Sequence, residues 1–187
     1  MTFGRSSVDM YPEQHNVALA DVSTFRKSIG GSPTNVAVAA ARLGRKAAVI
    51  NRVGDDAFGA YVRQGLREFG VHDEFVSTDP DLLTPVVFCE LMPPEEPSIY
   101  FYREPRGPDM DISVADMPMD AILSAPLFWL AGSRFAEEPS RSAAMAALEA
   151  RSRKQHTVID LDYRPMFWDS PAQAAEYISP SIDHCTV

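Results

Sequence analysis

The chain has 187 residues and a formal net charge of −9 at pH 7, with 17 basic and 26 acidic side chains. This length suits one well-packed domain, and the acidic balance argues against DNA or RNA as a partner, because phosphate backbones are bound by clustered cations. The sequence has no apolar run long enough to span a bilayer, and its two cysteines and four scattered histidines lack metal-ligand spacing, so we expect reduced thiols, no metal site and a cytoplasmic protein.

The N-terminal residues predict a short strand followed by a loop. Thr2 and Phe3 form the end of an apolar stretch, and Asp9 follows in the expected loop. A single aspartate after a strand is usually a turn former. Residues 16–28 then alternate loosely between apolar and polar side chains.

The rest of the chain is organised around Gly30 and Gly31. Two glycines allow the backbone to turn tightly and to approach a ligand without a Cβ in the way. Asn35 follows in the first turn of a predicted helix, where it offers a donor and an acceptor beside the free N–H groups of the helix. A pair of glycines before a helix is also a common turn, so these residues by themselves leave a turn and a binding site open.

The predicted helix itself covers a small, apolar run at residues 36–43. Ser32 is the expected N-cap, Pro33 suits the first turn, and Gly44 is the expected C-terminal stop. Because the run is almost wholly apolar, we expect a buried helix.

A strand at 47–50 and a second helix complete this part of the chain. Asp55 and Asp56 come directly before the helix, which is marked by apolar residues at helical spacing and ends at Gly70. Two adjacent aspartates can bind a metal, but helix capping is the interpretation that the position favours.

Residues 84–103 predict a hairpin. Two runs rich in β-branched and aromatic residues, 85–91 and 98–103, are separated by a polar, proline-rich turn at 92–97. A role in the core would explain Ile99 and Phe101. It does not explain why Arg103 closes an aromatic strand.

From residue 117 onward, strands and helices alternate. We expect helices at 119–124, 139–154 and 171–178 and strands at 127–131 and 157–161. This order predicts an α/β fold with a mostly parallel sheet, in which ligands bind beyond the carboxyl ends of the strands. Asp160, Asp162 and Arg164 lie at such an end, where Arg164 either forms a local salt bridge or places a second cation over a site.

The chain resembles the ribokinase-like (PfkB-type) carbohydrate kinases over essentially its whole length. The resemblance is carried by Gly30, Gly31, Asn35, Ala37, Gly44 and Gly54 at the spacing of the first family signature, by Tyr102-Arg103-Glu104, and by Asp160-Leu161-Asp162-Tyr163-Arg164-Pro165. It implies that residues 1–187 are the N-terminal portion of one ribokinase-like domain, with lid segments at about 16–28 and 84–106 and no separate second domain. Many relatives have asparagine at the position of Asp162.

The resemblance also implies a site for a sugar acid. Its expected substrate-binding residues are Asp9, Gly30, Gly31, Asn35, Tyr102, Arg103 and Arg164. In the relatives that act on keto-deoxy sugar acids, the aspartate accepts hydrogen bonds from sugar hydroxyls and the arginine pairs with the substrate carboxylate. A guanidinium suits that role because it donates two parallel hydrogen bonds to a planar anion.

The reaction implied by the family is transfer of the γ-phosphoryl group of ATP, with Mg²⁺, to the terminal hydroxyl of the sugar acid. The family's Asn-x-x-Glu and Gly-Ala-Gly-Asp motifs do not occur in residues 1–187. We therefore expect no catalytic or metal-binding residue here, a missing C-terminal portion, and no phosphorylation by these residues alone. The alternatives are a non-catalytic sugar-acid-binding module, a protein that forms a homodimer through the lid sheet, and a ketodeoxygluconate kinase or fructokinase-like member.

Overall fold

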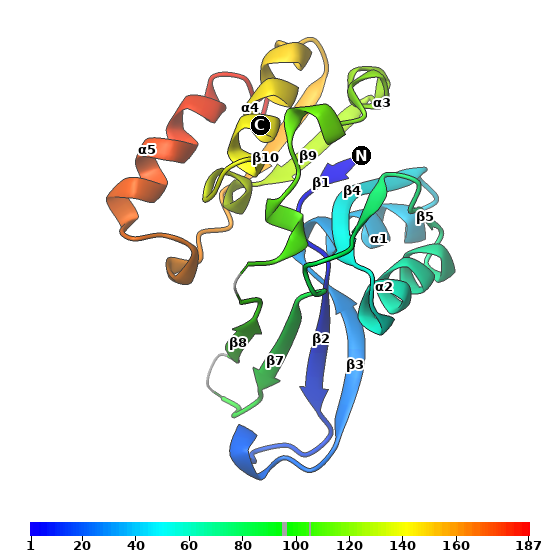
Figure 1. The fold of residues 1–187 in the computed structure, drawn as a ribbon, viewed down its shortest axis with the longest axis vertical. Helices are drawn as coiled ribbons and strands as arrows, with labels where there is room; N and C mark the ends of the chain where they lie inside the picture. The colour runs from blue at the N-terminus through cyan, green and yellow to red at the C-terminus, as the bar shows by residue number, and fades with distance from the viewer. Residues whose placement is uncertain (95–96, 105) are drawn as a thin grey trace.

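The structure is a computed structural model that describes residues 1–94, 97–104 and 106–187. Two sheets organise the chain, a larger one in the body and a smaller one that extends from it as a lid (Figure 1). The body strands are β1 (Thr2–Phe3), β4 (Ala47–Gly54), β5 (Val71–His72), β6 (Val76–Asp79), β9 (Leu127–Ala131) and β10 (His156–Asp160). The lid strands are β2 (Ser7–Pro12), β3 (Phe25–Gly30), β7 (Val86–Glu90) and β8 (Ser98–Tyr102).

The body sheet is parallel, with the order β10-β9-β1-β4-β5 and β6 beside β4. Its carboxyl ends therefore meet at one edge, which is the edge from which the lid extends. The lid has the order β3-β2-β7-β8, in which β2 and β7 are parallel and the two outer pairs are antiparallel.

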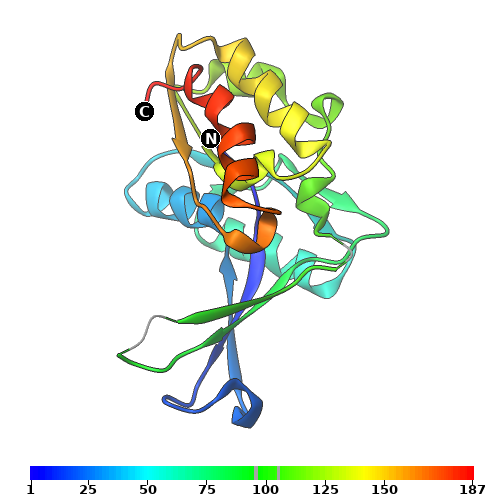
Figure 2. The ribbon, with the colours of Figure 1, turned by 90° about the vertical axis from the view of Figure 1, so that its left-hand side faces the viewer.

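Helices cover both faces of the body sheet (Figure 2). The α-helices are α1 (Ser32–Arg42), α2 (Ala57–Glu68), α3 (Met119–Ser124), α4 (Ser140–Arg151) and α5 (Pro171–Ile182), and short 3₁₀ helices include η2 (Pro108–Met110), η4 (Gly132–Phe135) and η5 (Pro165–Phe167). A hydrophobic core lies on each face of the body sheet, and successive residues of β4 point into opposite cores because side chains alternate along a strand. Val49 packs with α1 and α2, whereas Ile50 packs with α3, α4 and α5.

The expected α/β class, the hairpin at β7 and β8, and all five predicted helices are confirmed. Asp56 caps α2 as expected, and its Oδ1 accepts a 2.7 Å hydrogen bond from the Gly59 amide. The two cysteines are free, buried thiols. The expected turn at 92–97 and the segment after Arg103 include residues 95–96 and 105, which lie outside the described residues.

Three expectations were wrong. Asp9 lies inside lid strand β2 and not in a loop, because β3 and β7 pair with β2 on both sides. Gly31 is the N-cap of α1, and Ser32 is already the first helical residue. This helix lies on the surface of the body and is not buried, since Ala39 is exposed and its two valines, Val36 and Val38, are only half-buried.

Asp56 also holds the loop that leads into the lid, so its removal should destabilise the fold. Its Oδ2 accepts a 2.7 Å hydrogen bond from the Thr84 amide. Partial burial acts to raise the pKa of Asp56, but the backbone hydrogen bonds from Thr84 and Gly59 outweigh it and lower that pKa. We expect Asp56→Ala to lower the free energy of unfolding by about 2 kcal/mol in urea denaturation at pH 7.

The pH dependence of this effect follows from the lowered pKa. The contribution of Asp56 is complete above about pH 4, the ordinary range for aspartate, and is lost as the pH falls through the folded-state pKa. Asp55→Ala is the matched control, because the Asp55 side chain is exposed. Equal stability losses in the two variants would contradict this role for Asp56.

Candidate functional site

The expected site residues gather where the lid joins the body. Asp9 comes from lid strand β2, Gly30 and Gly31 connect lid strand β3 to α1, and Arg164 follows body strand β10. The parallel order of β1, β9 and β10 brings their carboxyl ends to this junction, which is where ligands bind in open α/β sheets.

The two glycines are required because other groups occupy the space of a side chain. A Cβ on Gly30 would overlap the Asp9 carboxylate, and a Cβ on Gly31 would overlap the carbonyl oxygen of Arg5. Gly31 also has a φ of 101°, which disfavours other residues. Gly30 thus lets the Asp9 carboxylate lie directly against the backbone, and Gly31 does the same for the Arg5 carbonyl.

Asp9 is held in place and partly shielded from solvent. The Ser7 hydroxyl donates a 2.7 Å hydrogen bond to Asp9 Oδ1. Burial raises the pKa of Asp9, although the hydrogen bond from Ser7 and the charge of Arg5 act in the opposite direction. The carboxylate keeps acceptor capacity for hydroxyl donors.

A polar chain links the start of α1 to the end of β10. Ser32 Oγ donates to Asp162 Oδ2 at 2.9 Å, and Arg164 Nη2 lies 3.1 Å from Asp162 Oδ1. The local salt bridge considered from the sequence is therefore present. The Arg164 side chain is 46% exposed, and Asn35 is also exposed, so both have donors available to a ligand.

Strand β8 presents different residues on its two faces. Asp9 pairs with Val87 and Val87 with Phe101, so the Phe101 side chain lies on the same face of the lid as Asp9. Tyr102 lies on the opposite face, where its ring centroid is 5.4 Å from that of Phe88. The structure therefore brings Arg103 and Phe101 toward the junction and places Tyr102 on the lid face opposite Asp9, although Tyr102 lines the same cavities as Arg103.

A cluster of charges lies beside these residues and was not anticipated from the sequence. It consists of the buried pair Asp109 and Arg134 and the half-buried Arg5 and Arg103. Asp109 is fully buried, and Arg134 donates to its Oδ2 at 2.6 Å and to its carbonyl oxygen at 2.7 Å. Arg103 Nη2 lies 3.7 Å from Asp109 Oδ1. Burial acts to raise the pKa of Asp109, but the charges of Arg134, Arg103 and Arg5 outweigh it and lower that pKa.

The same burial acts on the arginines. It lowers the pKa of Arg134, and it lowers the pKa of Arg5 to about 10, with Asp109 partly opposing the effect in each case. One sequence signal could have found these residues: Arg5 and Arg134 each follow shortly after a body strand, at the edge where ligands bind.

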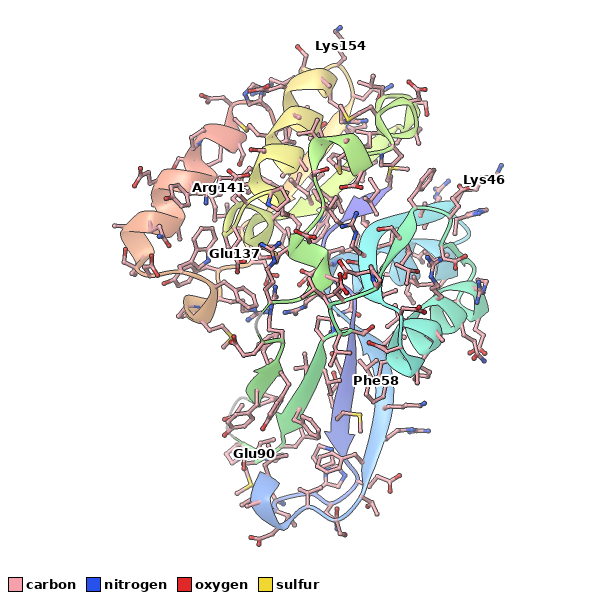
Figure 3. All side chains as sticks on the ribbon, in the orientation of Figure 1. Lys46, Phe58, Glu90, Glu137, Arg141 and Lys154 are labelled. Atoms are coloured by element: carbon pink, nitrogen blue, oxygen red, sulfur yellow. The ribbon has the colours of Figure 1, made fainter. Side chains whose placement is uncertain are left out.

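Two cavities flank the end of β8. One, of about 760 Å³, lies between β8 and the segment from η5 to α5, and the other, of about 710 Å³, lies on the side of Phe58 at the start of α2. Figure 3 shows Phe58 beside the lid, and it shows Glu137, which lines the first cavity, near the start of α4. Both cavities include Arg103, but neither is lined by Asp9, Gly30 or Asn35, so these two cavities adjoin the predicted sugar site without coinciding with it.

In the described part of the chain, no cluster of three or more His, Cys, Asp or Glu side chains could hold a metal ion. None of the helices described is both long and apolar enough to cross a membrane.

This arrangement of a parallel body sheet, a lid and a glycine-lined junction defines a sugar kinase fold. The chain belongs to the pfkB family of carbohydrate kinases, whose family model matches residues 1–187. The predicted ribokinase-like class is thereby confirmed.

Individual relatives point the same way. The chain is 33% identical to the 5-dehydro-2-deoxygluconokinase of Bacillus subtilis over 181 residues, and 36% identical to that of Photobacterium profundum over 179 residues. These matches cover 96% and 95% of the chain but 55% and 54% of the relatives, so the chain spans about half the length of the curated relatives it matches. Among solved structures, an uncharacterized sugar kinase from Pyrococcus horikoshii superposes with a TM-score of 0.88 at 26% identity. The match covers 98% of this chain and 62% of that one. The same kinase has also been solved in complex with ATP.

The contacts of Gly31 predict a strong effect of adding one methyl group. We expect Gly31→Ala to lower the free energy of unfolding by about 3 kcal/mol, because backbone strain adds to overlap with the Arg5 carbonyl. Gly44→Ala is the matched control, since Gly44 also has a positive φ of 76° but has no atom near an added Cβ. That variant should lose only about 1 kcal/mol in the same urea titration. Equal losses would show that overlap at Gly31 is unimportant.

Proposed function

We propose that residues 1–187 form the sugar-binding part of a kinase that transfers the γ-phosphoryl group of ATP to the terminal hydroxyl of 5-dehydro-2-deoxy-D-gluconate or a similar keto-deoxy sugar acid. The observation that carries the proposal is the position of Arg103, which follows β8 two residues after Phe101, on the strand whose Phe101 shares the lid face of Asp9, and whose guanidinium lies 3.7 Å from Asp109. A sugar acid presents hydroxyls and one carboxylate, which match Asp9 and Arg103. The names of the curated relatives support the same substrate.

Each residue at the junction has a distinct role in this proposal. Asp9 accepts hydrogen bonds from sugar hydroxyls, and Asn35 donates and accepts at the first turn of α1. Gly30 and Gly31 allow the sugar to approach the backbone closely. Arg103 and Arg164 pair with the carboxylate. Tyr102 is left out of this set because it lies on the other face of the lid.

The chemistry of the phosphoryl donor comes from ATP and Mg²⁺, which supply the transferred group and neutralise its charge when bound. We assign no ligand of either group to residues 1–187, because the family's Asn-x-x-Glu and Gly-Ala-Gly-Asp motifs do not occur in them. What these residues do is orient the terminal hydroxyl by fixing the other end of the sugar acid. With this substrate, we propose that the protein acts in myo-inositol breakdown in the cytoplasm.

The lid also supports a second role, as a surface that pairs with another copy of the chain. Strand β8 is an outer strand of the lid, and its Ile99, Tyr100 and Tyr102 are 38%, 44% and 65% exposed. An exposed aromatic strand edge is a ready template for pairing. We propose a homodimer formed through this edge.

Substitution of Arg103 tests the substrate assignment. In the protein as its source produces it, Arg103→Gln should weaken binding of the sugar acid by about 2 kcal/mol, because a charge-assisted hydrogen bond is lost, and should reduce its ATP-dependent phosphorylation accordingly. Titration calorimetry with the acid and with its neutral analogue, in which CH₂OH replaces the carboxylate, measures the effect. Asn35→Ala is the comparison variant and should weaken both ligands alike. Equal effects of Arg103→Gln on the two ligands would contradict the carboxylate role.

The homodimer has its own test in sedimentation velocity. We expect Tyr102→Glu to shift the protein from dimer to monomer, because a charge placed on the exposed edge opposes pairing. Lys154→Glu, at the end of the body far from the lid (Figure 3), should leave the dimer unchanged. A wild-type protein that sediments as a monomer at all concentrations would rule this interface out.

A further inference from the structure

The guanidinium of Arg5 forms no ion pair with a carboxylate among the described residues. It lies in the connection between β1 and β2, and its Nε is buried with no hydrogen-bond acceptor among the described residues. No ion pair within 4.0 Å involves its guanidinium in residues 1–94, 97–104 and 106–187. Arg5 as a whole is half-buried, and burying part of a charged group without a partner is unfavourable, so an anion beside its guanidinium would stabilise it.

The charges around Arg5 do not supply that anion. The groups that act on it are Asp109, Arg103, Arg134 and Asp9. Asp109 already pairs with Arg134. The Arg134 guanidinium donates hydrogen bonds to the Oδ2 and to the carbonyl oxygen of Asp109. Asp109 Oδ1 accepts no hydrogen bond from the described residues and lies 3.7 Å from Arg103. Three guanidiniums therefore face two carboxylates, Asp109 and Asp9, so one positive charge of this group stays without a counter-charge.

The guanidiniums of Arg5 and Arg103 both lie against the ring of Phe167, and Arg5 also lies against Phe101. The Cζ of Arg5 lies 4.5 Å from the ring centroid of Phe101 and 5.7 Å from that of Phe167. Arg103 Cζ lies 5.0 Å from the same Phe167 ring. The rings themselves meet edge to face at 5.4 Å. Stacking fixes a guanidinium and leaves the N–H donors around its rim free for an anion.

We infer that Arg5 is a further specificity-determining residue, which together with Arg103 clamps the carboxylate of the sugar acid. This inference rests on the proposed function, and it assigns to that site a residue outside the set predicted from the sequence. A single carboxylate between Arg5 and Arg103 would relieve the repulsion between them. A neutral sugar would leave that repulsion in place, so the pair selects acids over neutral sugars.

The experiment uses the protein as its source produces it, with Arg5→Gln, Arg5→Lys and, as a control, Arg26→Gln at an exposed arginine of lid strand β3. Titration calorimetry gives the Kd of each variant for 5-dehydro-2-deoxy-D-gluconate, for its neutral CH₂OH analogue and for inorganic phosphate. Arg5→Lys keeps a cation between the rings, so it tests the guanidinium even if Arg5→Gln fails to fold. Thermal unfolding of each variant is measured alongside.

We expect Arg5→Gln to raise the Kd for the sugar acid at least about tenfold and to leave the Kd for the neutral analogue unchanged. Arg5→Lys should show a smaller rise, again for the acid alone, and Arg26→Gln should show none. A parallel rise for both ligands, or no rise, would overturn the role of Arg5 while leaving the proposed function intact. Loss of phosphate binding without loss of acid binding would also overturn it. If the wild-type protein binds the neutral analogue as tightly as the acid, the proposed function and this inference both fail.

Discussion

The ion pair between Asp109 and Arg134 is the interaction on which the junction depends. Asp109 lies in η2, where the chain returns from the lid, and Arg134 lies in η4, directly after body strand β9. Both are almost fully buried, and the pair has two hydrogen bonds. Breaking such a pair typically costs about 3–5 kcal/mol, because a charge is left buried and uncompensated. The pair therefore ties the exit of the lid to the edge of the body sheet at which the site is built.

Around this pair, the site is assembled from segments that are far apart in the chain. Phe101 of β8 and Phe167 of η5 contact each other and hold Arg5 from the first connection of the chain. On the other side, the link from Ser32 through Asp162 to Arg164 joins α1 to the end of β10. The candidate site is thus a place where lid and body share polar contacts, and a ligand there would contact both.

The lid combines two physical tasks. One of its faces carries Asp9 and Phe101 toward the junction, and the other carries the Phe88 and Tyr102 pair toward solvent. Only one face of the lid can turn toward the junction, so the side chains on the other face stay exposed to solvent. This explains why strand β8 is aromatic along its length, and it is the basis for proposing a second copy of the chain as the partner of the exposed edge.

Local patterns in the sequence were enough to predict the five helices, the hairpin and most of the body strands, because helix periodicity, caps and turn glycines act over a few residues. They were also enough to single out Gly30, Gly31 and Arg103. Tertiary structure alone decided that residues 7–12 form a lid strand, since β2 exists through pairing with β3 and β7. It likewise decided that Tyr102 faces away from Asp9 and that Arg5, Arg103, Asp109 and Arg134 meet. The faces of a strand depend on its register, and a cluster of charges from four separate segments depends on how distant parts of the chain pack together.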